Sequence, residues 1–278
     1  MQPMEVGVFL ASLGVKDAVE GIKKAREIGI AVVQLHARVR FEYYDQGRAD
    51  EVRAALDGNS VTASATCAGY AGERYRDIQA VRETVGLTNP ATLEERIDET
   101  KRFADFTSAL GIPVMTTHIG VIPEDRRSED YRRLLGTIGL VADYCKSKSV
   151  TFAMETGQES AALMVDFMND LGHDNVKINF DPANMILYDS GDPIDALETL
   201  KDYVVHVHCK DGRRPTEAGK LGHEVPIGEG EVGIERYVDK LKEIGYAGPL
   251  VIEREGGADR VGDVLRAKAL LERFRDKA

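Results

Sequence analysis

A chain of 278 residues with a formal net charge of −11 is too short for two ordinary α/β domains, and its charge counts against nucleic acid or an anionic membrane as its partner. Hydrophobic residues make up 43% and charged residues 30% of the sequence, as in ordinary globular proteins. No apolar run reaches the roughly 18 residues that a membrane-spanning helix needs. We therefore expect a single domain covering residues 1–278.

Short apolar, β-branched runs alternate with longer amphipathic, charged stretches, a pattern typical of a parallel sheet covered by helices. The expected strands are Val6–Phe9, Val32–His36, Val61–Cys67, Pro113–His118, Val150–Glu155, Val176–Asp181, Tyr203–His208 and Leu250–Glu253. The expected helices lie near residues 16–28, 48–57, 92–110, 128–147, 159–171, 193–200, 233–244 and 260–274. Residues 1–10 have no basic region and no long apolar stretch, so they are interpreted as a first strand and not as a secretory signal.

Eight alternating units close into a barrel more naturally than they form an open sheet, and we predict an α/β fold, a single (β/α)8 TIM barrel. Glycines at 29, 111 and 245 follow three expected helices and suit short turns into the next strand. An open doubly wound sheet is the alternative, but no Gly-x-Gly-x-x-Gly motif follows the first strand.

Two connections after strands are long, namely residues 68–91 after the third strand and 209–232 after the seventh. Long connections in compact domains are usually lids or binding loops, and in a barrel the connections that follow strands face the active site. Residues 209–232 contain many glycines and charged residues, and we expect them to form a mobile lid or a partner contact.

Ionisable side chains follow the apolar runs of strands five to eight, where the strand ends of a barrel converge. They are Glu155, Asp181, His208 and Glu253. Carboxylates suit Mg²⁺ or Mn²⁺, and an imidazole shifts the preference toward Mn²⁺, Co²⁺ or Zn²⁺. Without a cation these carboxylates would repel one another. The pattern therefore predicts one divalent metal ion, with manganese favoured and magnesium, cobalt or zinc as alternatives.

Four further polar side chains near strand ends are candidates for substrate contact: His36, His118, Lys210 and Arg213. Each has a structural alternative. Lys210 could form an ion pair with Asp211, and Arg213 could be a solvated loop charge. His206 points to the same side as His208 but lies deeper, so we expect it to be a core histidine. Glu159 is expected at the start of a helix, where a carboxylate suits the helix dipole.

Several motifs, in their order and spacing, resemble the xylose-isomerase-like TIM-barrel superfamily, the sugar phosphate isomerase/epimerase group, over nearly the whole chain. These motifs are Glu155-Thr-Gly, Asp181-Pro-Ala-Asn184, His206-Val-His208-Cys-Lys210-Asp211-Gly, Ile227-Gly-Glu-Gly-Glu-Val-Gly and Val251-Ile-Glu253. Each motif is weak alone. Together they indicate the superfamily but not the substrate.

The resemblance implies that Glu155, Asp181, His208 and Glu253 are the metal ligands. Ketose 3-epimerases of this group use two glutamates as an acid–base pair on opposite faces of the substrate, which implies catalytic roles for Glu155 and Glu253. Such epimerases place a substrate-binding histidine three residues after the metal-binding aspartate; this chain has Asn184 there, which we expect to bind the substrate. The residues after Glu155 also differ from the epimerase pattern. The resemblance therefore supports the metal site of this chain more strongly than it supports epimerase activity.

We expect a metal-dependent enzyme, an isomerase or epimerase that acts on a small keto sugar or sugar derivative through an enediolate. The alternative is a lyase or dehydratase acting on a keto sugar, keto-glycoside or keto-cyclitol, because the superfamily includes an inosose dehydratase and enzymes of 3-keto sugars. A DNA endonuclease of this fold is disfavoured, because it would need several Zn²⁺ ions, more histidine ligands and a basic groove, whereas the net charge of this chain is −11. A non-catalytic binding protein would be expected to have lost ligands, yet all four are present.

The three cysteines, Cys67, Cys145 and Cys209, show no C-x-x-C pairing, so a disulfide framework is not expected and a cytoplasmic location is favoured. The expected partner is a small sugar or polyol, with no nucleic acid and no membrane. Related barrels often form dimers or tetramers, so a homo-oligomer is an option whose size no sequence feature determines.

Overall fold

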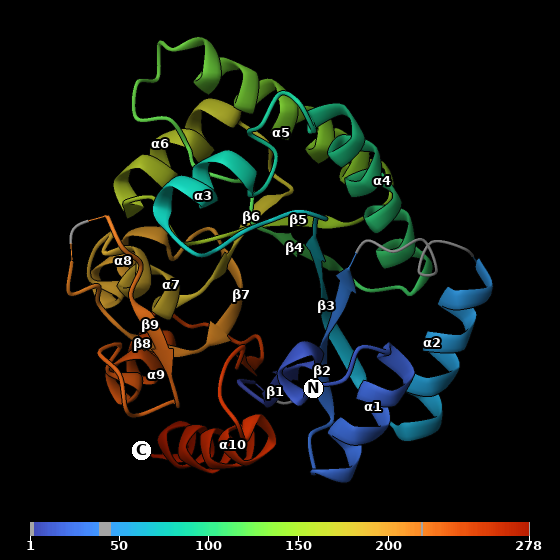
Figure 1. Cartoon of the computed structure of the whole chain (residues 1–278). Helices are drawn as coiled ribbons and strands as arrows, with labels where there is room; N and C mark the ends of the chain where they lie inside the picture. The colour runs from blue at the N-terminus through green and yellow to red at the C-terminus, as the bar shows by residue number, and fades with distance from the viewer. Residues whose placement is uncertain (1–2, 39–45, 218, 278) are drawn as a thin grey trace.

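The computed structural model describes residues 3–38, 46–217 and 219–277, and these residues form a closed barrel of eight parallel strands (Figure 1). Strands β1 to β7 follow one another around the barrel, and β10 closes it between β7 and β1. The barrel strands are β1 (Val6–Phe9), β2 (Val32–Arg38), β3 (Thr62–Gly69), β4 (Val114–Thr117), β5 (Thr151–Glu155), β6 (Val176–Phe180), β7 (Val204–Cys209) and β10 (Leu250–Ile252). The expected (β/α)8 barrel is confirmed.

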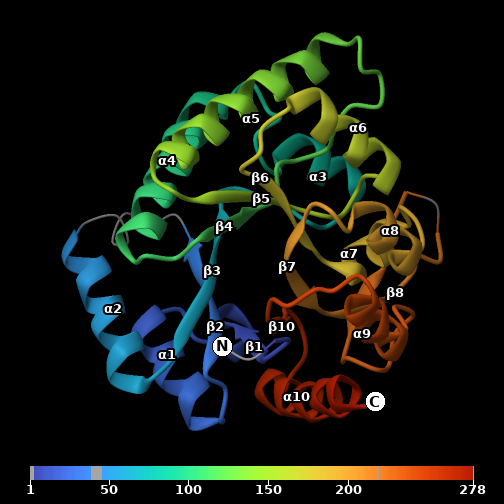
Figure 2. The ribbon, with the colours of Figure 1, turned by 180° about the vertical axis from the view of Figure 1, so that it is seen from behind.

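Helices surround the barrel in both views of the molecule (Figures 1 and 2). They are the 3-10 helix η1 (Leu10–Leu13), then α1 (Ala18–Glu27), α2 (Gln46–Asn59), α3 (Ile78–Thr84), α4 (Leu93–Ala109), α5 (Glu129–Ser147), α6 (Ala161–Leu171), α7 (Pro182–Tyr188), α8 (Pro193–Leu200), α9 (Ile234–Glu243) and α10 (Arg260–Asp276). All the expected strands and helices are present, and their ends differ from the expected ones by no more than two residues. Within the described part of the chain, every helix is too short or too polar to cross a membrane.

The local sequence explains where the covering helices begin and end. In α5, the hydroxyl of Ser128 accepts a hydrogen bond from the backbone N–H of Tyr131 and so caps the first turn. Gly29, Gly111 and Gly245, which follow α1, α4 and α9, all have positive φ, as expected for residues that stop a helix and turn the chain into the next strand.

Three short helical segments, η1, α3 and α7, were not expected from the sequence. Helix α7 follows directly from Asp181, whose carboxylate accepts hydrogen bonds from the N–H groups of Ala183 and Asn184, with Pro182 at the first helical position. A helix of seven residues has too few turns for an apolar periodicity to reveal it. The consequence is that Asp181 both caps a helix and stands at the mouth of the barrel.

The segment 209–232, expected to be a mobile lid, contains a small antiparallel sheet of β8 (Asp211–Arg213) and β9 (His223–Val225). The buried carboxylate of Asp211 organises this segment. It accepts hydrogen bonds of 2.9, 2.9, 3.1 and 3.2 Å from the N–H groups of Gly212, Gly228, Gly230 and Val232. The segment is therefore tied to the end of β7 at several points, and its role as a lid stays a prediction.

We expect Asp211→Ala to lower the free energy of unfolding by about 2–3 kcal/mol, because buried backbone donors would lose their acceptor. The same change should speed proteolytic cleavage within 209–232. Urea unfolding and limited proteolysis measure the two effects. Asp239→Ala, an exposed aspartate on α9, is the matched control. Wild-type stability and wild-type protease resistance in Asp211→Ala would refute the anchoring role.

Candidate metal centre

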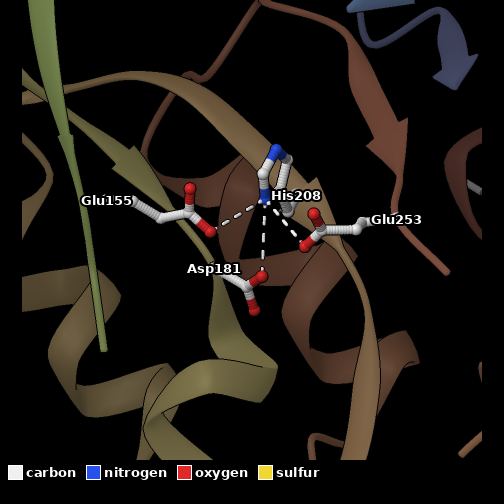
Figure 3. Close-up of side chains that lie close together, drawn as sticks. All are labelled: Glu155, Asp181, His208 and Glu253. Carbon is white, nitrogen blue, oxygen red and sulfur yellow. Dashed lines mark ion pairs between the residues drawn. The ribbon is translucent and has the colours of Figure 1, made fainter. Parts of the chain in front are cut away.

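Four ionisable side chains meet at the carboxyl ends of the later barrel strands. Glu155 is the last residue of β5, Asp181 directly follows β6, His208 lies near the end of β7, and Glu253 directly follows β10. One ligand atom from each lies within 4.8 Å of the others, and all four residues are buried. The barrel thus brings the four residues expected as metal ligands into one cluster (Figure 3).

The cluster is arranged around one imidazole nitrogen. His208 Nδ1 lies 3.3 Å from Glu155 Oε1, 3.4 Å from Asp181 Oδ2 and 3.3 Å from Glu253 Oε2. Figure 3 shows Glu155 and Glu253 on opposite sides of His208, with Asp181 between them. Three carboxylate oxygens and one nitrogen therefore face a common point.

These residues fit a divalent cation. Asp181 Oδ1 accepts the two N–H groups at the start of α7, whereas the buried Oδ2 makes no close hydrogen bond within the described residues and has His208 Nδ1 at 3.4 Å and Lys210 Nζ at 3.9 Å. A buried carboxylate oxygen without a hydrogen-bond donor is costly unless a positive charge lies near it. Oxygen ligands with one imidazole nitrogen are a donor set that Mn²⁺, Co²⁺ and Zn²⁺ accept, and Mg²⁺ is compatible with its carboxylates.

The orientation of His208 is set from the opposite side of its ring. His208 Nε2 lies 2.7 Å from Gln34 Oε1, and Gln34 Nε2 in turn donates to Thr116 Oγ1 at 3.0 Å. Because Gln34 uses its amide nitrogen on Thr116, its oxygen accepts the proton of His208 Nε2, and Nδ1 is left facing the carboxylates. Gln34 was not among the sequence candidates. A polar residue inside the apolar run Val-Val-Gln-Leu was the available signal.

The charged groups of the cluster stabilise one another's ionised forms. Burial opposes ionisation of each group, yet Glu253 and Glu155 raise the pKa of His208 well above its ordinary 6.5. For Glu253, burial is outweighed by Lys210 and His208, which lower its pKa to about 2. For Glu155, His118 and His208 likewise overcome burial and lower the pKa. Both glutamates are therefore anionic at neutral pH.

Lys210 lies inside the centre. Its ammonium group is buried and lies 3.0 Å from Glu253 Oε2 and 2.7 Å from Glu255 Oε1. Asp211, with which it could have formed an ion pair, instead bonds to backbone N–H groups. The alternative of an ion pair between Lys210 and Asp211 is therefore wrong. The ammonium group of Lys210 lies instead next to Glu253, a proposed metal ligand.

Two other sequence candidates contact Glu155. Asn184 Nδ2 donates to Glu155 Oε1 at 3.1 Å, and His118 Nε2 lies 3.5 Å from the same oxygen. The other ring nitrogen of His118 is buried and makes no hydrogen bond within the described residues, and the ring packs against Tyr75 with centroids 5.8 Å apart. Both side chains therefore lie where a substrate held at the centre could meet them.

The remaining candidates lie farther out. The ring of His36 packs on Phe9 at 5.2 Å, and Phe9 in turn stacks on His208 at 6.0 Å. Arg213 is exposed and donates to the carbonyl of Glu229, with no contact to the four central groups among the described residues. The geometry thus gives Arg213 no position at the centre, and its substrate contact stays a prediction.

His206 and Glu159 are both buried. His206 Nδ1 lies 2.8 Å from Asn179 Oδ1 and Nε2 lies 3.0 Å from Ser64 Oγ, so both ring nitrogens have partners, as expected for a core histidine. Burial, aided by His208, lowers the pKa of His206 to about 3.

Glu159 precedes α6, which Ser160 caps, and it accepts a hydrogen bond from the N–H of Ile122. The expectation that Glu159 begins the helix was therefore wrong. Burial raises its pKa to about 7.

Comparison with known proteins agrees with the barrel fold. The family model for xylose isomerase-like TIM barrels matches residues 22–276. A solved xylose isomerase domain protein from Planctomyces limnophilus is 37% identical, with a TM-score of 0.91 and 98% of each chain covered.

More distant similarities involve sugar epimerases. A D-psicose 3-epimerase from Clostridium cellulolyticum H10, solved with D-tagatose, is 18% identical with a TM-score of 0.72 over 98% of each chain, a likeness of fold alone. L-ribulose-5-phosphate 3-epimerase UlaE from Escherichia coli K12 is 25% identical over 194 residues, which cover 67% of this chain and 66% of that protein.

Replacing Asp181 by Asn should weaken Mn²⁺ binding at least about 100-fold, because a charged ligand is lost while the cap of α7 can still form. Asp192→Asn is a matched control, since Asp192 caps α8 through the same pair of backbone bonds and also precedes a proline. Calorimetric titration of metal-free protein gives both affinities. Equal Mn²⁺ affinity in the two variants would exclude Asp181 as a ligand.

Mn²⁺ binding should release about one proton per ion at neutral pH, because a metal must displace the proton that the carboxylates hold on His208. The pKa of His208 is raised, so the proton is present below that pKa and metal affinity should fall about tenfold per pH unit as pH decreases. Titrations in two buffers of different ionisation enthalpy count the proton. His118→Asn, which keeps all four ligands, should release the same number. A count of zero in the wild type would contradict the expectation.

Proposed function

The chain belongs to the family of xylose isomerase-like TIM barrels, and we propose that it is a divalent-metal-dependent isomerase or epimerase of a small keto sugar or sugar derivative, acting through an enediolate. The four buried ligand atoms within 4.8 Å of one another carry this proposal. The likeness to a D-psicose 3-epimerase and to L-ribulose-5-phosphate 3-epimerase supports the choice of keto sugars.

We propose Glu155, Asp181, His208 and Glu253 as the ligands and Mn²⁺ as the favoured metal, with Mg²⁺, Co²⁺ or Zn²⁺ as alternatives. When bound there, the cation would polarise the carbonyl of the sugar and acidify the neighbouring C–H group. The chain's own residues then have two tasks, which are to move a proton and to hold the sugar.

Proton transfer falls to Glu155 and Glu253. They stand on opposite sides of the cluster and are both anionic at neutral pH (Figure 3). One carboxylate removes the proton from one face of the sugar. The second glutamate, once it has taken up a proton from solvent, can deliver that proton to the opposite face and invert the carbon, whereas delivery of a proton to the neighbouring carbon moves the carbonyl. Epimerisation and isomerisation thus use the same pair.

Substrate positioning falls to donors around this pair. Asn184 and His118 contact Glu155, and Lys210 contacts Glu253, so each proposed base has a polar neighbour that a sugar hydroxyl could also bind. These contacts also fix the carboxylate positions. The burial of all four proposed ligands limits the contact of the reacting carbon with bulk water.

Elimination is the second candidate, and the position of Lys210 favours it. A buried ammonium group next to Glu253 is a hydrogen-bond donor that could stabilise a departing hydroxyl or alkoxide. A lyase or dehydratase acting on a keto sugar, keto-glycoside or keto-cyclitol would then use the same first proton abstraction. The fate of the substrate oxygen separates the two functions.

The three free cysteines support a reducing compartment, and we retain the cytoplasm as the proposed location. We also retain self-association into a homo-oligomer as part of the proposal, to be measured by light scattering.

Glu155→Gln and Glu253→Gln should each lower kcat by about 10²–10⁴-fold at saturating Mn²⁺, because the transferred proton loses its base. Asn184→Ala should instead raise KM for the same sugar more than it lowers kcat. Saturating metal is essential, since Gln also weakens metal binding. Steady-state kinetics with a panel of keto sugars gives both constants.

In D2O, the wild type should place deuterium on the carbon next to the carbonyl of a true substrate, as detected by NMR. Turnover without exchange at that carbon, and without a primary isotope effect when it is deuterated, would reject the enediolate. A hydride-shift isomerase would then be the better interpretation.

A further inference from the structure

A trough of about 1340 Å³ lies among the connections that follow β3, β4, β5 and β6. Its walls come from residues 78–90, 121–134 and 158–166, with Tyr188 and Ser190 at one side. Figures 1 and 2 both show α3 beside α6, the two helices between which this trough runs. All these segments belong to connections that follow barrel strands, so the trough opens at the same end of the barrel as the four ligands.

Two features of the chain bring the trough near the centre, namely the segment that follows Glu155 and the side chain of Tyr188. Gln158 and Glu159, which line it, are the third and fourth residues after Glu155. Tyr188 also lines it and packs close to Gly157, where an added Cβ would lie 3.4 Å from the tyrosine ring. Burial raises the pKa of Tyr188, and Lys210 of the metal centre is close enough to affect it. Tyr188 therefore borders both spaces.

The charges of the trough do not suit an ionic ligand. Its lining has three arginines and five acidic residues. Arg126 lies 3.0 Å from Asp166 and Arg133 lies 2.7 Å from Asp130, so two of the arginines already have carboxylate partners. A phosphate or sulfate group would need free cations and would meet repulsion from the remaining carboxylates.

The same lining suits a neutral, hydroxylated ligand. Gln158 lines the trough, and its side-chain nitrogen makes no hydrogen bond within the described residues, so the protein leaves this donor without an acceptor. Apolar side chains such as Leu87 and Leu163 alternate with these polar groups. Sugar hydroxyls both donate and accept, while the C–H faces of a sugar ring pack on apolar groups.

We propose that the trough binds a second sugar unit, joined to the keto sugar that reacts at the metal centre, so that the substrate class is a keto-disaccharide or similar glycoside and not a free monosaccharide. The volume supports this, because it exceeds the roughly 300–1,000 Å³ of ordinary small-ligand pockets, and the reacting sugar occupies the neighbouring centre. This inference rests on the proposed function and extends it to a substrate class.

The test compares D-fructose with glucosyl-fructose disaccharides linked through O3, O4, O5 or O6 of the fructose unit, using Mn²⁺-loaded protein. We expect kcat/KM for deuterium incorporation from D2O to be at least about tenfold higher for one or more of the disaccharides, since the extra contacts add binding energy. The linkage that performs best would indicate which end of the keto sugar faces the trough.

Two variants act on the trough in different ways. Leu163→Trp narrows it, and Gln158→Met removes the buried amide at similar volume. Each should lower the ratio of disaccharide to monosaccharide kcat/KM by about tenfold, the effect of a lost hydrogen bond or an obstructed contact. Leu265→Trp, the same change at an exposed leucine of α10 that does not line the trough, should leave the ratio unchanged.

Equal kcat/KM for deuterium incorporation into D-fructose and into every disaccharide would overturn the inference and leave the proposed function standing. If no sugar is processed, the proposed function loses its support, and saturation-transfer NMR tests the trough separately. The expected result there is binding of a disaccharide to the wild type that Leu163→Trp weakens and Leu265→Trp does not. No saturation transfer to any of the disaccharides from the wild type would overturn the inference.

Discussion

Three buried carboxylates face one imidazole nitrogen, and this concentration of negative charge is the constraint on which the rest of the structure depends. Glu155, Asp181 and Glu253 would repel one another by several kcal/mol in so dry a setting if nothing offset their charge. The chain supplies part of the compensation through His208, Lys210 and the backbone N–H groups at the start of α7. What remains is a site suited to a cation, which is why the cluster is interpreted as a metal centre and not as a structural ion pair.

The interior of the barrel supports this centre with a layer of hydrogen bonds where many barrels have only apolar side chains. Gln34 and Thr116 hold one side of His208, while His206 is held by Asn179 and Ser64. Such a layer is favourable only when each member finds a partner, and here the partners come from strands far apart in the chain. The gain is that the His208 ring is fixed in orientation before any ligand arrives.

The connections after the strands have a different task from the strands. The barrel sets where the four proposed ligands stand, whereas residues 78–90 and 121–134 line the trough outside it. Asp211 illustrates the division, because one buried carboxylate at the end of β7 organises a whole connection through its backbone N–H groups. A common metal centre can thus serve substrates of different size when these connections change.

The sequence by itself determined the succession of strands and helices and the positions of the four proposed ligands. Apolar periodicity is a local property, and each ligand directly follows an apolar run, so Glu155 and Glu253 could be found without coordinates. Only the tertiary structure decided that Gln34 orients His208, 174 positions away, and that Lys210 pairs with Glu253. It also decided the trough and the short helices α3 and α7. These depend on strand register and barrel closure, which bring distant residues together, and a helix of one or two turns forms from capping and packing that leave no periodic signal.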